Sequence, residues 1–107
     1  MALEVNQDNF NTEVVAADRT VLVDFWGPSC QNCLALMSFI DKIAEKYKDK
    51  LKVVKVDSSK NRQLCIKFRV MSLPTFLVLR SGQEIGRISG KSVNEQEIVN
   101  FVNQNLS

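Results

Sequence analysis

Residues 21–33 decide the fold, and they read Val21-Leu22-Val23-Asp24-Phe25-Trp26-Gly27-Pro28-Ser29-Cys30-Gln31-Asn32-Cys33. Residues 21–26 are a short apolar, β-branched run that Gly27-Pro28 ends, and this pattern predicts a central strand buried on both faces. From Gln31 to about Lys48, apolar side chains recur at helical spacing, which predicts a long helix packed against the sheet. Two cysteines, Cys30 and Cys33, therefore lie where a buried strand leads into a helix.

The rest of the chain alternates between strand and helix patterns. Further short apolar runs predict strands at residues 3–5, 51–56, 75–79 and 84–89. Further helices are predicted after a candidate N-cap at Asn6, around residues 64–68, and after a capping box that begins at Ser92 or Asn94. Helices between the early strands require parallel pairing, whereas the turn residues Ser81-Gly82 predict an antiparallel hairpin. We expect an α/β protein with a mixed sheet and helices on both faces.

Composition limits the size and class of the protein. The chain has 107 residues, of which 45% are apolar and 24% charged, and this favours a single globular domain over residues 1–107. A net charge of +2 is too small for an electrostatic nucleic-acid binder. The chain begins without a signal-peptide pattern, and no apolar stretch approaches the roughly 20 residues of a membrane span. We expect a cytoplasmic monomer with neither nucleic-acid nor membrane partners.

The sequence contains no histidine and three cysteines. The lack of histidine excludes a Ser-His or Cys-His nucleophile pair and removes the usual metal ligand. In a reducing compartment, a Cys-x-x-Cys pair is typical of catalysis or metal binding. A metal site needs about four ligands, and only Cys65 is left over, so a metal would have to be shared between two chains. Two inert, core-packed thiols are the other alternative, which the position at a helix start disfavours. Cys65 itself fits a buried free cysteine that acts as a small hydrophobic residue.

Position gives the two cysteines different chemistry. At a helix N-terminus the pKa of a thiol falls from about 8.5 to roughly 3.5–7.5, which favours the thiolate of Cys30. Cys33, one turn further along, is close enough to form a disulfide but more shielded. This arrangement predicts thiol–disulfide exchange, in which Cys30 attacks and Cys33 resolves. Asp24 is a carboxylate in an apolar strand, and burial there raises the pKa of the group; the alternative is a side chain that reaches solvent at the strand end.

Residues 25–33 resemble the active-site segment of the thioredoxin family, and Leu73-Pro74-Thr75 resembles its cis-proline segment. The resemblance spans nearly the whole chain and implies a thioredoxin fold, a central mixed five-stranded sheet flanked by four helices. It implies a protein dithiol–disulfide oxidoreductase of the protein-disulfide reductase type, which binds no cofactor and no metal. Its partners would be disulfide-containing proteins and a thioredoxin-reductase-like electron donor. The alternative that stays open is a redox-inactive binding or scaffold module with this fold.

The resemblance also implies roles for residues around the cysteines. Asp24 would take part in proton transfer with Cys33, with Lys55 in support, although a lysine within a strand often only extends its amine to solvent. Pro74 would follow a cis peptide bond and shape a groove in which a substrate chain pairs with the backbone. The expected substrate-binding surface consists of Trp26, Pro28, Ser29, Ser72, Leu73 and Gly90.

The departures from the family pattern concern the same region. Gln31-Asn32 stands where the family commonly has Gly-Pro, Ser29 where it has tryptophan, and Ser38 where it has a helix proline. Because the dipeptide changes the backbone donors around the thiolate, we expect a reduction potential less negative than the roughly −270 mV of a typical thioredoxin. Trp26-Gly27-Pro28, Ala35-Leu36-Met37 and Ser58-Ser59 are similar to atypical thioredoxins of amino-acid-fermenting anaerobes.

Overall fold

Five strands form one sheet in the order β1-β3-β2-β4-β5, namely β1 (Leu3–Glu4), β2 (Thr20–Trp26), β3 (Leu51–Asp57), β4 (Thr75–Arg80) and β5 (Gln83–Ser89). Strands β1 and β2 pair with β3 in parallel, whereas β4 is antiparallel to both β2 and β5. The structure is a computed structural model that describes residues 2–106. Met1 and Ser107, the ends of the expected domain, lie outside the described residues. The predicted mixed sheet is confirmed.

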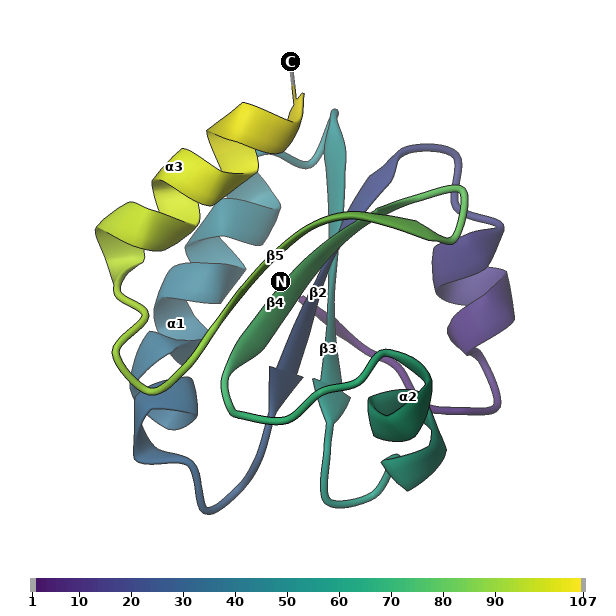
Figure 1. Ribbon diagram of the computed structural model, residues 1–107. Helices are drawn as coiled ribbons and strands as arrows, with labels where there is room; N and C mark the ends of the chain where they lie inside the picture. The colour runs from purple at the N-terminus through teal and green to yellow at the C-terminus, as the bar shows by residue number, and fades with distance from the viewer. Residues whose placement is uncertain (1, 107) are drawn as a thin grey trace.

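Helices cover both faces of the sheet (Figure 1). The long helices α1 (Gln31–Lys46) and α3 (Glu95–Leu106) lie on one face, and a π-helical turn η1 (Asn11–Val15) and the short helix α2 (Arg62–Lys67) lie on the other. Each face has its own apolar cluster, with Leu22 of β2 among the residues packed under α1 and α3, and Val23 among those packed under η1 and α2. Strand β2 is buried on both faces, as its continuous apolar run predicts. The α/β thioredoxin fold is confirmed.

The first helix differs from the expectation. The Oδ1 of Asn6 accepts hydrogen bonds from the backbone N–H groups of Asp8 (2.8 Å) and Asn9 (3.2 Å), the donors that an N-cap residue uses, but these residues form a turn and η1 begins only at Asn11. An Asn side chain that bonds nearby backbone donors competes with helix formation in this way. Phe10 and Val14 are nevertheless buried in the predicted core.

The second half of the chain follows its capping and turn signals. Ser81 and Gly82 both have positive φ (51° and 80°), which suits the tight hairpin between β4 and β5. Of the two candidate capping residues, Asn94 is the one used, because its Oδ1 accepts the N–H of Glu97 at 2.9 Å. Within residues 2–106, none of the helices combines the length and apolar character needed to cross a bilayer.

Candidate active site

The two cysteines form a disulfide at the start of α1. Cys30 is the N-cap residue and Cys33 lies in the first turn, and their Cα atoms are 5.3 Å apart. The backbone N–H of Cys33 donates to Sγ of Cys30 at 3.2 Å, so a helix N-terminal donor already points at the first sulfur. Cys33 is 2% exposed, whereas Cys30 is half-buried. A partly exposed cysteine therefore precedes a shielded one, as the sequence predicts.

Asp24 is buried in the middle of β2, with 2% of its surface exposed. Burial raises the pKa of its carboxyl group from 3.8 to about 7, against the opposing effect of the Lys55 charge. Leu22, two residues earlier, packs under α1, and because side chains alternate along a strand, Asp24 faces the same helix, which carries Cys33. Oδ1 of Asp24 has no hydrogen-bond partner among the described residues. The acid can therefore change its protonation near neutral pH, beneath the helix that holds the second cysteine.

Lys55 is directly opposite Asp24 in the pairing of β2 with β3. Its side chain is half-buried, and Nζ lies 3.8 Å from Sδ of Met37 on α1. The amine is thus held under the helix. The alternative interpretation of Lys55 required an amine that extends fully into solvent. Glu4 pairs with Lys55 from the other side, on β1, which gives the row Glu4–Lys55–Asp24 across three strands.

A groove of about 450 Å³ opens beside Cys30. It is lined by Gly27, Pro28, Ser29, Cys30, Ser58, Ser59 and Leu73. The Leu73–Pro74 peptide bond is cis, as the resemblance implies, and the N–H of Gly90 donates to the carbonyl oxygen of Pro74 at 3.0 Å. Three of the expected substrate-binding residues therefore line the groove.

The other expected binding residues lie around this groove. Ser72 is exposed next to Leu73, and Gly90 is half-buried beside Pro74. Trp26 is among the residues that line a different cavity, of about 570 Å³, together with Asp57 and Asn61. Trp26 does not line the groove beside Cys30, and this position fits a packing role better than direct contact with a substrate.

Ser58, Ser59 and Asn32 also lie at the site, and none of them was predicted there from the sequence. The signal for the two serines is their position after β3: parallel strands end at the same edge of a sheet, so residues that follow β3 lie next to those that follow β2. Asn32 left no comparable signal, because its side chain bonds backbone carbonyl groups 59 and 61 residues away.

Cys65 is half-buried rather than fully buried, which corrects the expectation of a core cysteine. Helix α2 is short, and Leu64 is its only residue that is fully buried, so the neighbouring Cys65 lies at the edge of the core. Its Sγ is 3.9 Å from the carbonyl oxygen of Ser58. Across the described part of the chain, no group of three or more His, Cys, Asp or Glu side chains is arranged to hold a metal ion.

A disulfide at a helix N-terminus, next to an open groove, serves thiol–disulfide exchange and defines the class of dithiol–disulfide oxidoreductases. A model of the family described as thioredoxin matches residues 1–104. The chain is 37% identical to thioredoxin 1 of Nostoc sp. over 89 residues (83% of each chain), and 38% identical to the thioredoxin of Acetoanaerobium sticklandii over 86 residues (80% of this chain and 82% of the relative). It is also 36% identical over 103 residues to a chloroplastic M-type thioredoxin of Chlamydomonas reinhardtii (96% of this chain and 73% of the relative).

The chain belongs to the thioredoxin family. It is a thiol–disulfide oxidoreductase with the protein-disulfide reductase activity of that family, and Cys30–Cys33 is its redox-active disulfide. The narrower similarity to thioredoxins of amino-acid-fermenting anaerobes stays a prediction, because relatives from different organisms match almost equally well.

Proposed function

We propose that Cys30 is the nucleophile that attacks a disulfide of a target protein and that Cys33 resolves the mixed disulfide. The observation that carries this assignment is the half-buried Cys30, which lines the groove at the N-terminus of α1, followed by the shielded Cys33. In the first step, the Cys30 thiolate bonds to one target sulfur and the other leaves as a thiolate. In the second, the Cys33 thiolate attacks Sγ of Cys30, which closes the disulfide and releases the second target thiolate. Two electrons pass from the protein to its target.

Asp24 accepts the proton of Cys33 before the second step. Its position under α1 and a pKa of about 7 support this role, because a base works best when its pKa lies near the working pH. Lys55, opposite Asp24, supports the charged form of the acid. Pro28, Ser29 and Leu73 line the groove in which the target is bound, while Ser72, Pro74 and Gly90 complete its rim.

The partners that we propose are proteins with accessible disulfides and a thioredoxin-reductase-like donor that returns two electrons and two protons. The two thiols carry these electrons themselves, so the proposed cycle needs neither a bound cofactor nor a metal. We further propose that residues 1–107 act as one monomeric domain in the cytoplasm, where a Cys-x-x-Cys pair can be kept reduced between turnovers. Size-exclusion chromatography and immunoblots of cell fractions test these two points.

Insulin-disulfide reduction with dithiothreitol as electron source tests the assignment of the cysteines. We expect Cys30→Ser to abolish the activity, and Cys33→Ser to accumulate mixed disulfides with target proteins that dithiothreitol releases. Cys65→Ser is the matched control and should keep the activity. If Cys30→Ser kept full activity, or if Cys65→Ser lost it, the proposed roles would be wrong.

A further inference from the structure

The side chain of Asn32, between the two cysteines, makes two long-range hydrogen bonds. Its Nδ2 donates to the carbonyl oxygens of Lys91 and Val93, each at 3.0 Å. A carboxamide has two N–H donors, and both are used here. Because both partners are acceptors, only the amide nitrogen, and not the amide oxygen, can face them. Asn32 therefore clamps the start of α1 to the loop that joins β5 to α3, which passes the beginning of α1 in Figure 1.

This loop is connected in turn to the proline on the other side of the disulfide. The N–H of Val93 donates to the carbonyl oxygen of Gly90 at 3.1 Å, and the N–H of Gly90 donates to that of Pro74 at 3.0 Å. A continuous chain of hydrogen bonds thus runs from the cysteine dipeptide through the loop to the edge of the groove. Val93 is 4% exposed and packs in the same apolar cluster as Leu36 of α1, so one end of the loop is anchored in the core.

Apart from the bonds described above, which include the turn bond between Val93 and Gly90, the exposed residues of this loop make no other hydrogen bond that the described residues record. Lys91 and Ser92 are exposed, and Gly90 has a φ of 114° with no atom within 4 Å of where a Cβ would lie. A glycine that no neighbouring atom contacts gives the backbone wide conformational freedom. The bond from Asn32 to Lys91 fixes the segment at this point. Gln31, the other residue of the dipeptide, is exposed and makes no side-chain hydrogen bond that the described residues record.

We propose that Asn32 is a positioning residue for polypeptide substrates, which holds the loop 90–93 and thereby the backbone around Pro74 in the geometry that receives an extended target segment. The proposal rests on the proposed function, because it assumes that targets bind beside Cys30. A protein disulfide must bring its flanking backbone against the rim, so it depends on the clamp. A small disulfide needs only the sulfur of Cys30 and does not. Asn32 therefore favours the reduction of protein disulfides over that of small-molecule disulfides.

The test compares two probes on the same variants. Asn32→Ala and Asn32→Leu remove the donors, Asn32→Gln keeps the carboxamide, and Gln31→Ala is the matched control. With dithiothreitol as electron source, we expect KM for insulin to rise about five- to tenfold in Asn32→Ala and Asn32→Leu, as the loss of two hydrogen bonds predicts. The kcat for insulin should stay unchanged within about twofold. The rate constant with which the reduced protein reacts with 5,5′-dithiobis(2-nitrobenzoate) should also stay unchanged within about twofold. Asn32→Gln should recover part of the loss, and Gln31→Ala should behave as the unmodified protein.

Amide hydrogen exchange gives an independent readout, since residues 90–93 should exchange faster in Asn32→Ala while the thermal midpoint shows that the variant is folded. An equal loss with insulin and with the small disulfide would mean that Asn32 acts on the cysteines, and unchanged kinetics with both would mean that it has no role; either result overturns the proposal. If the unmodified protein reduced neither probe, the proposed function itself would fail. The two failures are therefore distinguishable.

Discussion

Asp24 lies directly opposite Lys55 in the β2–β3 pairing, yet the two side chains form no salt bridge within the described residues, and Oδ1 of Asp24 is unpaired. The lysine amine is placed against Met37 of α1 instead. The carboxyl group is thus close enough to feel the positive charge but is not neutralised by it. Burial therefore dominates, and the pKa of Asp24 is about 7.

Asp24→Asn should stabilise the protein at pH 8 and much less at pH 4. The folded state keeps the proton of Asp24 up to about pH 7, whereas the unfolded chain loses it near pH 3.8, so the stability falls as the pH rises between these values. The cost of the buried charge is fully present above pH 7, and a shift from 3.8 to about 7 corresponds to about 4 kcal/mol in the free energy of unfolding. Guanidinium unfolding of the unmodified protein and of Asp24→Asn at pH 4 and pH 8 measures this difference in the free energy of unfolding.

The matched control for this experiment is Asp18→Asn, since Asp18 is exposed on the surface next to Arg19. This variant should change the free energy of unfolding by less than about 0.5 kcal/mol at either pH. A stabilisation by Asp24→Asn of the same size at pH 4 and pH 8 would contradict a buried acid that ionises near neutral pH.

The two neighbours of Asp24 in its cross-strand row should move its pKa in opposite directions. Lys55 lowers the pKa of Asp24 and Glu4 raises it. Lys55→Met should therefore raise the pKa above about 7, and Glu4→Gln should lower it towards the ordinary value. Carbon-13 NMR titration of the Asp24 carboxyl measures both shifts. A pKa that moved in the same direction in both variants would show that the variants act through packing rather than through charge.

Much of this site could be predicted from residue types and their spacing. The apolar run 21–26 and the helical spacing after Gln31 place the cysteines at a helix start, because burial and periodicity are properties of the local sequence. Asp24 was predictable for the same reason, as a charged residue within a strand whose two faces are both covered. Even the hairpin at Ser81-Gly82 follows from the conformations that its turn residues favour.

The unpredicted features depend on contacts between distant segments. Asn6 carries the signal of a helix N-cap, and its Oδ1 accepts the backbone N–H groups two and three residues on, as an N-cap does, but those residues form a turn and η1 begins only at Asn11. The bonds of Asn32 end on backbone carbonyl groups, which every residue has, so no residue type marks Lys91 or Val93 as partners. Side-chain periodicity gives no information on such contacts.

Asn32→Pro should make the reduction potential more negative. Asn32 has a backbone N–H in the first turn of α1, where the family commonly has proline, which has no N–H. We expect this N–H, next to the Cys33 N–H that donates to Sγ of Cys30, to favour the Cys30 thiolate of the reduced protein, and a stabilised reduced form gives a potential less negative than roughly −270 mV. Asn32→Ala keeps the N–H and should shift the potential less. A glutathione redox titration measures all three proteins, and a value at or below −270 mV for the unmodified one would contradict the argument.

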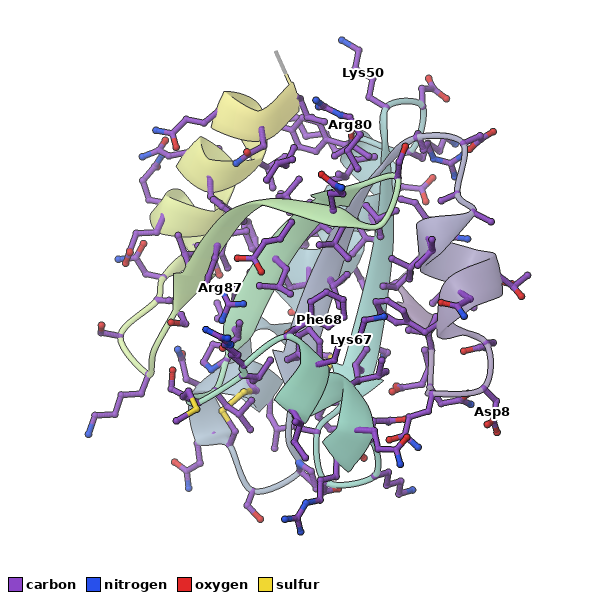
Figure 2. The ribbon with its side chains drawn as sticks, turned by 45° about the vertical axis from the view of Figure 1, so that its right-hand side comes forward. Asp8, Lys50, Lys67, Phe68, Arg80 and Arg87 are labelled. Carbon is purple, nitrogen blue, oxygen red and sulfur yellow. A yellow bond between two sulfur atoms is a disulfide. The ribbon has the colours of Figure 1, made fainter. Side chains whose placement is uncertain are left out.

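Loss of the half-buried Arg87 side chain should destabilise the fold. Figure 2 shows it on β5, close to the segment that contains Phe68, and its guanidinium donates to the carbonyl oxygens of Phe68 and Arg69. It also pairs with Glu84 at 2.9 Å, which lowers the pKa of that carboxyl, so the pair contributes above the ordinary value of 4.5 and is lost as the pH falls. Together these contacts tie β5 to the segment that follows α2.

We expect Arg87→Met to lower the free energy of unfolding by about 1–2 kcal/mol at pH 7, because two backbone carbonyls lose a charged donor. Arg87→Lys should recover less than half of this, since a single ammonium group cannot bind the carboxylate in the bidentate manner and reach both carbonyls. Lys91→Met removes an exposed positive charge and serves as the control. Guanidinium unfolding decides: equal effects of Arg87→Met and Lys91→Met would mean that Arg87 contributes only its charge, and that its hydrogen bonds to Phe68 and Arg69 add nothing to stability.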